Sequence, residues 1–293
     1  MAASLGSVLS KLVTYIIVVF FMSKICESSK HNSSRKALHW SSAGATWYGS
    51  PNGAGSDGTY IYRSKWGVNE LNILYKMAEL VAGGACGYGN LVSEAPFASM
   101  VTGIGPSLYK SGKECGACYM IKCRKHPLCS RKMVRVVITD FCPGGACLSD
   151  AAHFDLSGTA FGAMAVPSQQ DKLRDAGMLQ IRYARVPCDY SGKKVAFKVD
   201  AGSNPNYMAV VVEYEEGDGD LGRVDLQQAS SSEWLEMKQS WGAVWKLDPG
   251  FELHPPLSIR LISQHSLQTL VAKNVIPIGW RAGATYTSLV NYL

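Results

Sequence analysis

The sequence predicts an all-β protein of two domains, and three observations support this prediction. The chain has 293 residues, 47% of them hydrophobic, which is enough for two ordinary cores. Short β-type runs recur along it, separated by Gly, Pro, Asn and Asp. The last 105 residues contain no cysteine. This change in composition predicts one domain over residues 44–190 and a second over residues 195–290.

The N-terminus is predicted to be a signal peptide, residues 1–26. Lys11 precedes an apolar stretch of 11 residues, Leu12–Met22, which is short for a membrane span but typical of a secretion signal. The alternative is a short buried helix. A polar tail, residues 27–43, follows, and Asn32 begins a glycosylation sequon in it. We therefore expect a secreted protein without membrane contact after signal cleavage.

The net charge and the distribution of basic residues bear on whether the protein binds nucleic acid. The chain carries a formal net charge of +6, and 18% of its residues are charged, which argues against wholesale disorder and against a coiled coil. Its basic residues are scattered and form no dense run, so nucleic acid is not an expected partner.

Eight cysteines remain after the signal peptide. An even number in a secreted chain predicts disulfides. The metal-like spacing of four of them around His126 leaves a zinc site as the alternative, but an oxidising compartment favours disulfides, and no metal or other cofactor is expected. Eight cysteines permit 105 pairings, so spacing alone does not fix the connectivity. The eight are Cys86, Cys115, Cys118, Cys123, Cys129, Cys142, Cys147 and Cys188.

The first domain is predicted to be a β-rich barrel with little helix. Alternating or β-branched residues predict strands over Ala45–Tyr48, Met133–Thr139 and Leu179–Val186. The clearest helix is Gln169–Ala176, with Gly177 as its stop signal.

The second domain is predicted to be a β-sandwich. Six short β-type runs lie at close spacing, as is typical of that architecture. They are Val195–Val199, Tyr207–Tyr214, Gly222–Gln227, Ala243–Leu247, Leu257–Ser263 and Thr269–Val275.

Candidate chemistry gathers around His153 and Asp155. A carboxylate beside aromatic side chains in a cleft is how a sugar-cleaving acid is built, because low polarity raises its pKa. Hydrolysis also needs a second carboxylate, yet residues 41–56 contain none, so Asp57 and Asp140 are the nearest substitutes. The alternative is that Asp155 caps the next element and that His153 is a buried histidine with its hydrogen bonds satisfied.

Four aromatic residues of the second domain could bind a polysaccharide, since exposed rings stack on sugar faces. Trp241 and Trp245 have the same parity, so on one strand they would share a face. A sandwich core also needs one or two Trp. We expect at least one of the four, Tyr207, Trp234, Trp241 and Trp245, to be core, and Trp234 or Trp245 sooner than Trp241.

Six motifs, in this order, resemble those of the plant β-expansins: residues 45–49, 84–89, 115–119, 153–155, 204–207 and 240–245. The similarity runs from about Ala45 to Tyr286. It implies a six-stranded double-psi β-barrel, similar to family-45 endoglucanases, followed by an immunoglobulin-like carbohydrate-binding β-sandwich. It also implies a monomer of the plant cell wall that binds cellulose and xylan. Such a protein would loosen non-covalent contacts without hydrolysis and would not be an enzyme.

The resemblance also implies particular residues. Asp155 falls where the related endoglucanases keep their general acid, while their base on the first strand is absent. The implied polysaccharide cleft comprises Thr46, Trp47, Tyr48, Asp57, Asp140, His153 and Asp155. The implied binding surface of the second domain comprises Tyr207, Trp241 and Trp245. The implied disulfides are Cys86–Cys115, Cys118–Cys188 and Cys123–Cys129, with Cys142–Cys147 as the remaining pair.

One segment departs from the family. The 24 residues Thr59–Ala82 stand where family members run almost directly from Gly55–Gly58 into the Gly-Ala-Cys-Gly-Tyr motif. A retained intron that keeps the reading frame, or an error in the gene model, would produce this insert, and a real loop is the alternative. Two other functions stay open: a β-1,4-glycan endoglucanase or lytic glycosidase, and a module that only binds glycan.

Overall fold

A computed structural model describes residues 38–55, 84–190 and 192–292 of the chain. The predicted signal peptide, most of the polar tail with Asn32, Asp57 and the insert at 59–82 lie outside the described residues. Within the described ranges, no helix is long and apolar enough to cross a bilayer.

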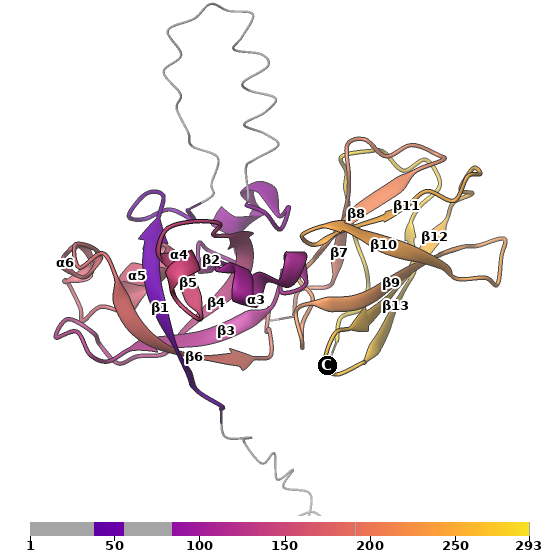
Figure 1. The fold of residues 1–293 in the computed structure, drawn as a ribbon. Coiled ribbons are helices and arrows are strands. Elements are labelled where there is room, and N and C mark those ends of the chain that lie inside the picture. Colours follow the sequence, from indigo (N-terminus) through magenta and orange to yellow (C-terminus); the bar gives the residue numbers. More distant parts are fainter. Residues whose placement is uncertain (1–37, 56–83, 191, 293) are drawn as a thin grey trace, which may run out of the picture. The chain divides into compact units, whose positions relative to one another are not determined.

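Six strands close the first domain into a barrel, in the order β1-β5-β2-β4-β3-β6 (Figure 1). The pairings β1 with β5 and β2 with β4 are parallel, and the other four are antiparallel. The strands are β1 (Ser41–Tyr48), β2 (Val101–Ile104), β3 (Cys118–Cys123), β4 (Val134–Phe141), β5 (His153–Ser157) and β6 (Leu179–Val186). The connections contain short helices: η1 (Gly89–Ser93), α3 (Pro106–Tyr109), η2 (Lys110–Gly112), α4 (Ala146–Ser149), α5 (Gly158–Ala163) and α6 (Gln170–Arg174).

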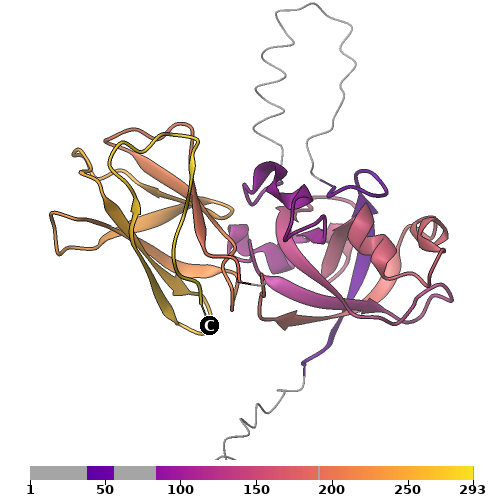
Figure 2. The same ribbon diagram turned by 180° about the vertical axis from the view of Figure 1, so that it is seen from behind.

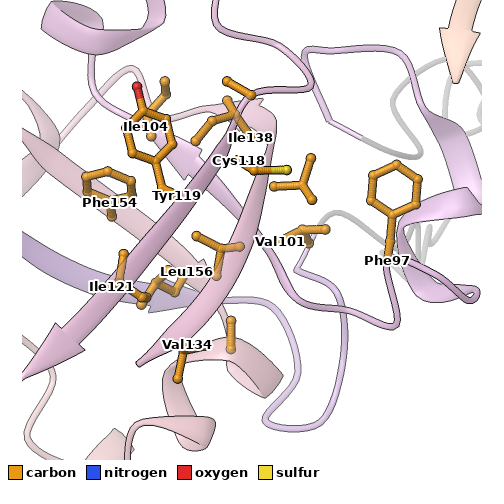
Figure 3. Packing of buried hydrophobic residues seen from close by; sticks show 14 of the residues in the cluster. Phe97, Val101, Ile104, Cys118, Tyr119, Ile121, Val134, Ile138, Phe154 and Leu156 are labelled. Carbon is orange, nitrogen blue, oxygen red and sulfur yellow. The ribbon is translucent and has the colours of Figure 1, made fainter. Parts of the chain in front are cut away.

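The barrel interior is filled by branched and aromatic side chains from alternate strand positions. Ile104, Ile121, Phe154 and Leu156 are fully buried and converge there from β2, β3 and β5 (Figure 3). Each fully buried side chain of this size stabilises a fold by about 1.5–3 kcal/mol. The barrel is therefore a packed core, and its functional groups lie at its surface.

The predicted elements of the barrel match the structure closely, with one correction. Strand β6 has the predicted bounds, and β4 starts one residue later than predicted and runs on to Phe141. Strand β1 begins at Ser41, so the predicted tail, residues 27–43, is three residues too long. Helix α6 covers only the middle of the predicted helix.

The second domain consists of eight strands in the order β13-β12-β9-β10-β11-β8-β7-β14. Figure 2 shows this domain from behind, in orange and yellow. Strand β10 pairs with β9 through Leu235–Met237 and with β11 through Lys238–Trp241, so it belongs to both layers of the sandwich. The strands are β7 (Ala196–Val199), β8 (Met208–Glu213), β9 (Leu221–Gln228), β10 (Leu235–Trp241), β11 (Val244–Leu247), β12 (Leu257–Ser263), β13 (Thr269–Ile276) and β14 (Thr285–Thr287).

Aliphatic side chains from both layers form the sandwich core. Val210, Leu226 and Ile259 are fully buried in it. All six predicted runs coincide with strands, whereas β10 and β14 were not predicted, because β10 is mostly polar and β14 has only three residues.

Four disulfides lie in the barrel: Cys86–Cys115, Cys118–Cys188, Cys123–Cys129 and Cys142–Cys147. These are the four pairs that the resemblance implies. Because the sulfurs are oxidised in these bonds, they offer no thiolates for the alternative zinc site around His126.

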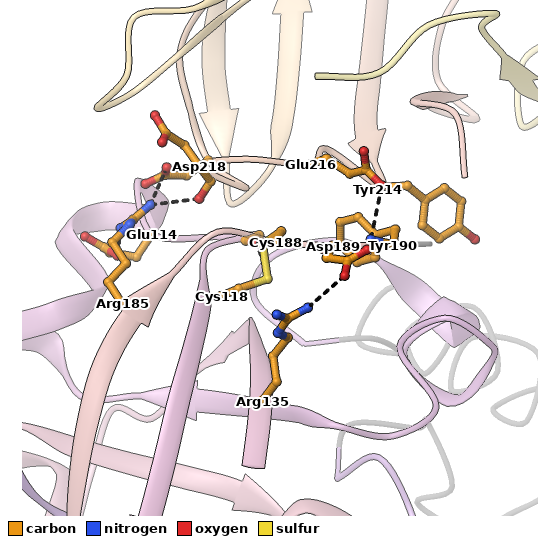
Figure 4. The surroundings of a disulfide bond; sticks show 12 residues. Glu114, Cys118, Arg135, Arg185, Cys188, Asp189, Tyr190, Tyr214, Glu216 and Asp218 are labelled. Carbon is orange, nitrogen blue, oxygen red and sulfur yellow. Dashed lines mark hydrogen bonds and ion pairs between the residues drawn. A yellow bond between two sulfur atoms is a disulfide. The ribbon is translucent and has the colours of Figure 1, made fainter. Parts of the chain in front are cut away.

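The two domains meet through backbone hydrogen bonds and buried charges. Cys188 and Gly217 exchange two backbone hydrogen bonds, of 2.7 and 3.2 Å. The Arg185 guanidinium donates to Glu114 Oε2 at 2.7 Å in the barrel and to Asp220 Oδ1 in the sandwich (Figure 4). The side chains of Glu114 and Asp220 are only 4% and 1% exposed, so Arg185 neutralises two carboxylates removed from water.

Candidate functional site

The parallel pairing of β1 and β5 assembles a polar cluster at the barrel surface. The register places Thr46 opposite Asp155 and Gly44 opposite His153. Thr46 Oγ1 donates to Asp155 Oδ1 at 2.6 Å and lies 2.9 Å from His153 Nε2. One hydroxyl on β1 therefore links two functional groups of β5.

The other nitrogen of the buried His153 ring is also held. His153 Nδ1 lies 2.7 Å from Asp150 Oδ2, at the end of the short helix α4. Gly44 leaves room for this pair, because a Cβ there would collide with Asp150 Oδ2. The result is a continuous hydrogen-bonded series, Asp150–His153–Thr46–Asp155.

The positions of the protons in this series determine whether Asp155 donates or accepts a hydrogen bond. The Thr46 hydroxyl has one proton, so when it donates to Asp155, Nε2 of His153 must carry a proton and donate to Thr46 Oγ1. In the reverse arrangement, protonated Asp155 donates to Thr46, and Thr46 donates to Nε2. The two arrangements hold the same number of protons. Asp155 and His153 thus share one proton through Thr46.

The surroundings of Asp155 favour its protonated form. Burial raises the pKa of its carboxyl, and the nearby charge of Asp140 raises it further. The hydrogen bond from Thr46 and the charge of His153 act in the opposite direction, but the pKa remains above its ordinary value. Asp155 is therefore suited to donate a proton or a strong hydrogen bond to a sugar oxygen.

Asp140 faces the same part of the barrel but is occupied by other donors. Its Oδ1 accepts from the backbone N–H groups of Ala85 and Phe141 at 2.7 and 2.8 Å, and its Oδ2 accepts from the Tyr48 hydroxyl at 3.0 Å. These bonds anchor the motif at residues 84–89 to β4. Asp140 is thus held in place as an acceptor within the barrel structure.

Gly103 on β2 separates the two acids. It pairs with Asp155 on one side and with Asp140 on the other, so the two Cα atoms lie two strand spacings apart, roughly 10 Å. A glycine leaves the floor between the carboxyl groups without a side chain. No side chain of β2 therefore stands between the two acids at this register.

Not every residue of the implied cleft joins this cluster. Thr46, Tyr48, Asp140, His153 and Asp155 come together, and Asp57 lies outside the described residues. Trp47 has the opposite parity on β1, packs against the barrel core, and donates from Nε1 to the Arg174 carbonyl at 3.1 Å.

Asp150 and Gly103 belong to the cluster but were not identified from the sequence. The sequence did contain an indication of Asp150, since it lies three residues before His153 on the same short segment. Gly103 had none, because its position between the acids depends on strand order.

In the second domain, Trp241 is 47% exposed at the end of β10. Its ring lies against the barrel motif at residues 84–89, since a Cβ on Gly87 would come within 3.0 Å of it. Tyr207 is half-buried and packs against the barrel core. An aromatic surface of the sandwich therefore adjoins the barrel segment that Asp140 anchors.

Trp245 is a correction to the expected surface. It is only 7% exposed and belongs to the sandwich core. The parity argument failed because Gly242 and Ala243 form a turn between β10 and β11, so Trp241 and Trp245 lie on different strands. Trp234 is half-buried beneath the guanidinium of Arg260, 4.5 Å from the ring centre.

Two groups among the described residues bring three possible metal ligands together, and neither has a suitable donor set. One consists of Asp155 with the sulfurs of Cys142 and Cys147, which are already joined to each other. The other is Glu114, Asp220 and His265, where the guanidinium of Arg185 already neutralises both carboxylates.

Comparison with known proteins agrees with this architecture. Residues 195–277 match the model of the expansin C-terminal domain, and residues 101–183 match a double-psi barrel model described as lytic transglycolase. Putative expansin-B2 of Arabidopsis thaliana is 53% identical over 86% of this chain and 83% of its own length. Expansin-B11 of Oryza sativa subsp. japonica is 51% identical over 86% of this chain and 78% of its own length.

Two solved structures share the fold. The apo expansin of Clavibacter michiganensis superimposes with a TM-score of 0.60 at 22% identity, over 87% of this chain and 98% of that chain. A mutant of the same bacterial expansin, solved in complex with cellohexaose, superimposes with a TM-score of 0.59 at 21% identity.

A double-psi barrel with an acid cluster, followed by a β-sandwich with an exposed tryptophan, defines a two-domain all-β protein. Within that class, the identity to plant relatives over most of the chain settles the family. The chain belongs to the plant β-expansins.

Proposed function

We propose that this chain loosens plant cell walls from outside the cell by binding cellulose-type β-1,4-glucan and disrupting non-covalent contacts between wall polysaccharides, without hydrolysis. The observation that carries the proposal is a single acid, Asp155, that is linked to His153 through Thr46 and, among the described residues, has no free second carboxylate beside it. The family membership and the cellohexaose complex of the bacterial expansin support the choice of ligand.

The sandwich would bind the glucan by stacking, and the barrel would bind it by hydrogen bonding. The exposed ring of Trp241 and the half-buried ring of Tyr207 would stack on the flat faces of glucose units. Asp155 would then hydrogen-bond a sugar hydroxyl or the glycosidic oxygen. A glucan chain so held exchanges its hydrogen bonds to neighbouring chains for bonds to the protein. Loosening of this kind requires no covalent step.

Hydrolysis would need a base as well as an acid. Among the described residues, β1 carries no carboxylate, Asp140 is engaged by three donors, and Asp150 is bound to His153. None of these groups is free to activate water. The alternative of an endoglucanase or lytic glycosidase therefore has less support than wall loosening.

Three finer points belong to the same proposal. Xylan is a second substrate, since the mild basicity of the chain suits xylans that carry glucuronate. The protein works as a monomer. The segment at residues 1–26 directs it to the cell wall and is then removed.

A wall-extension assay on the full chain, with sugar release measured in the same samples, tests the function. We expect extension without soluble reducing sugar. Asp155→Asn keeps the size of the side chain but removes its acid proton, so extension should be abolished while cellulose binding stays nearly unchanged. Sugar release by the wild-type protein would instead indicate hydrolysis, and extension at the wild-type rate by the variant would exclude Asp155 as the functional acid.

A further inference from the structure

The Cys142–Cys147 disulfide closes a short loop between two acids of the site. The bonded cysteines are 5 residues apart, and the loop runs from the end of β4 into α4. Asp140 lies two residues before the loop, and Asp150 lies three residues after it. The disulfide therefore closes the chain segment that leads from Asp140 to Asp150, the first member of the hydrogen-bonded series.

The same disulfide lies against the acid itself. Both sulfurs and a carboxylate oxygen of Asp155 lie within 4.8 Å of one another. A disulfide is weakly polar and forms no strong hydrogen bond, so it shields this side of the carboxyl group from water. It contributes to the burial that raises the pKa of the Asp155 carboxyl.

Backbone contacts dock the loop on the rest of the site. Cys142 N–H donates to the Ile104 carbonyl at 3.0 Å, at the end of β2, the strand that carries Gly103. Asp150 N–H donates to the Ala146 carbonyl at 3.2 Å, within the segment that the disulfide closes. The position of Asp150, and hence of the His153 ring, thus depends on this loop.

Exposure distinguishes this disulfide from the other three. Seven of the eight bonded cysteines are buried, and Cys142 alone is half-buried. The Cys123–Cys129 disulfide closes a loop of similar length, with its cysteines 6 residues apart, but both cysteines are buried. A reductant in solution therefore reaches Cys142–Cys147 first.

We propose that the Cys142–Cys147 disulfide is a positioning element of the acid site: it holds Asp150, and through it His153 and Thr46, in the arrangement that sets Asp155, and its reduction loosens that arrangement. The effect on wall extension rests on the proposed function. The effect on the geometry of the cluster is independent of that function.

Reduction by a dithiol proceeds in two balanced steps. One thiolate of the dithiol attacks Cys142 Sγ, and Cys147 leaves as a thiolate. The second thiolate of the reagent then displaces Cys142, and the reagent is oxidised to its own cyclic disulfide. The protein gains two electrons and two protons and keeps its other three disulfides.

The hydrogen bond between His153 and Asp150 provides the first readout. A proton on His153 Nδ1 that is shared with a carboxylate gives a strongly downfield proton resonance, which Asp150→Asn assigns. We compare the full chain with C142A/C147A and with the matched control C123A/C129A. The resonance should be present in the wild type and the control, and lost or shifted upfield in C142A/C147A and in wild type treated with dithiothreitol.

Persistence of the resonance in C142A/C147A would overturn the proposal, and so would its loss in both double variants, since the effect would then be general. Near-UV circular dichroism shows whether each variant is folded. Should C142A/C147A not fold, wild type reduced at this disulfide alone and capped with iodoacetamide takes its place under the same criteria.

Wall extension provides the second readout. We expect C142A/C147A to lose about tenfold or more, because displacing a functional group by about 1 Å can cost that much. C123A/C129A should keep most of its activity. If the resonance is lost and extension is unchanged, the positioning role stands and the proposed use of Asp155 fails. If wild type itself does not extend walls, the proposed function fails, and the resonance still tests the positioning.

Discussion

The barrel and the sandwich are both β-structures with packed cores, but they present function in different ways. The barrel holds one acid in a series of hydrogen bonds in which each partner is placed by another strand or loop. The sandwich presents an exposed indole that depends on no polar network. A site built from linked polar groups is sensitive to small displacements, whereas a stacking surface is sensitive mainly to the loss of its ring. The four disulfides lie in the barrel, where position matters more.

The largest expected effect comes from breaking the charge contact between the two regions. Arg185→Met leaves Asp220 buried without its guanidinium partner, while Glu114 keeps Lys110 at 2.6 Å, and the loss at Asp220 should cost about 3–5 kcal/mol of stability. Denaturant unfolding at neutral pH measures this loss. Arg182→Met is the matched control, because Arg182 makes an exposed bond to a backbone carbonyl only. Equal stability of the two variants would show that the contact does not hold the domains together.

The next effect concerns the pH dependence of the sandwich. Burial raises the pKa of Glu213 to about 7, with Glu94 raising it and Lys198 lowering it. The folded state therefore binds this proton more tightly than the unfolded state. Stability is full below the unfolded pKa of 4.5 and falls as pH rises towards 7. The loss from this group is on the order of 3 kcal/mol.

Glu213→Gln should remove that part of the pH dependence. Thermal unfolding from pH 4 to pH 8 should fall less steeply in the variant than in the wild type. Glu215, whose pKa burial also raises, contributes to both proteins in the same way, so the difference isolates Glu213. Parallel curves would contradict the assignment.

The smallest expected effect separates the two tryptophans. Trp241→Ala should weaken binding to insoluble cellulose by about 1–3 kcal/mol, by analogy with stacking on other aromatic platforms, with little loss of stability. Trp245→Ala should instead cost about 3–5 kcal/mol of stability, because it empties a core position. Pull-down and denaturant unfolding measure the two effects, and a reversed pattern would refute the placement of these rings.

The sequence was sufficient to predict features that depend on local pattern. The alternation in Leu179–Val186 predicted β6. The residues around His153 and Asp155 left a capping carboxylate and a buried histidine as the alternative, so the acid role, which the resemblance implies, stays a prediction. The role of Gly103 was not predictable, because it depends on β2 lying between β5 and β4. Trp245 was misplaced because the turn at Gly242 separates it from Trp241. What the sequence could not supply was the order in which distant strands pair.

The bond between Cys118 and Cys188 also determines how mechanical load passes through the molecule. Cys188 lies at the end of the barrel and is hydrogen-bonded in both directions to Gly217 of the sandwich. A pull on the sandwich by a moving cellulose chain therefore enters the barrel at Cys188 and crosses the sulfur bridge directly to β3. Of the 69 residues of chain between the two cysteines, those that form β4 and β5 lie off this path. The acid site can thus keep its shape while the protein is under tension, which is the condition in an extending wall.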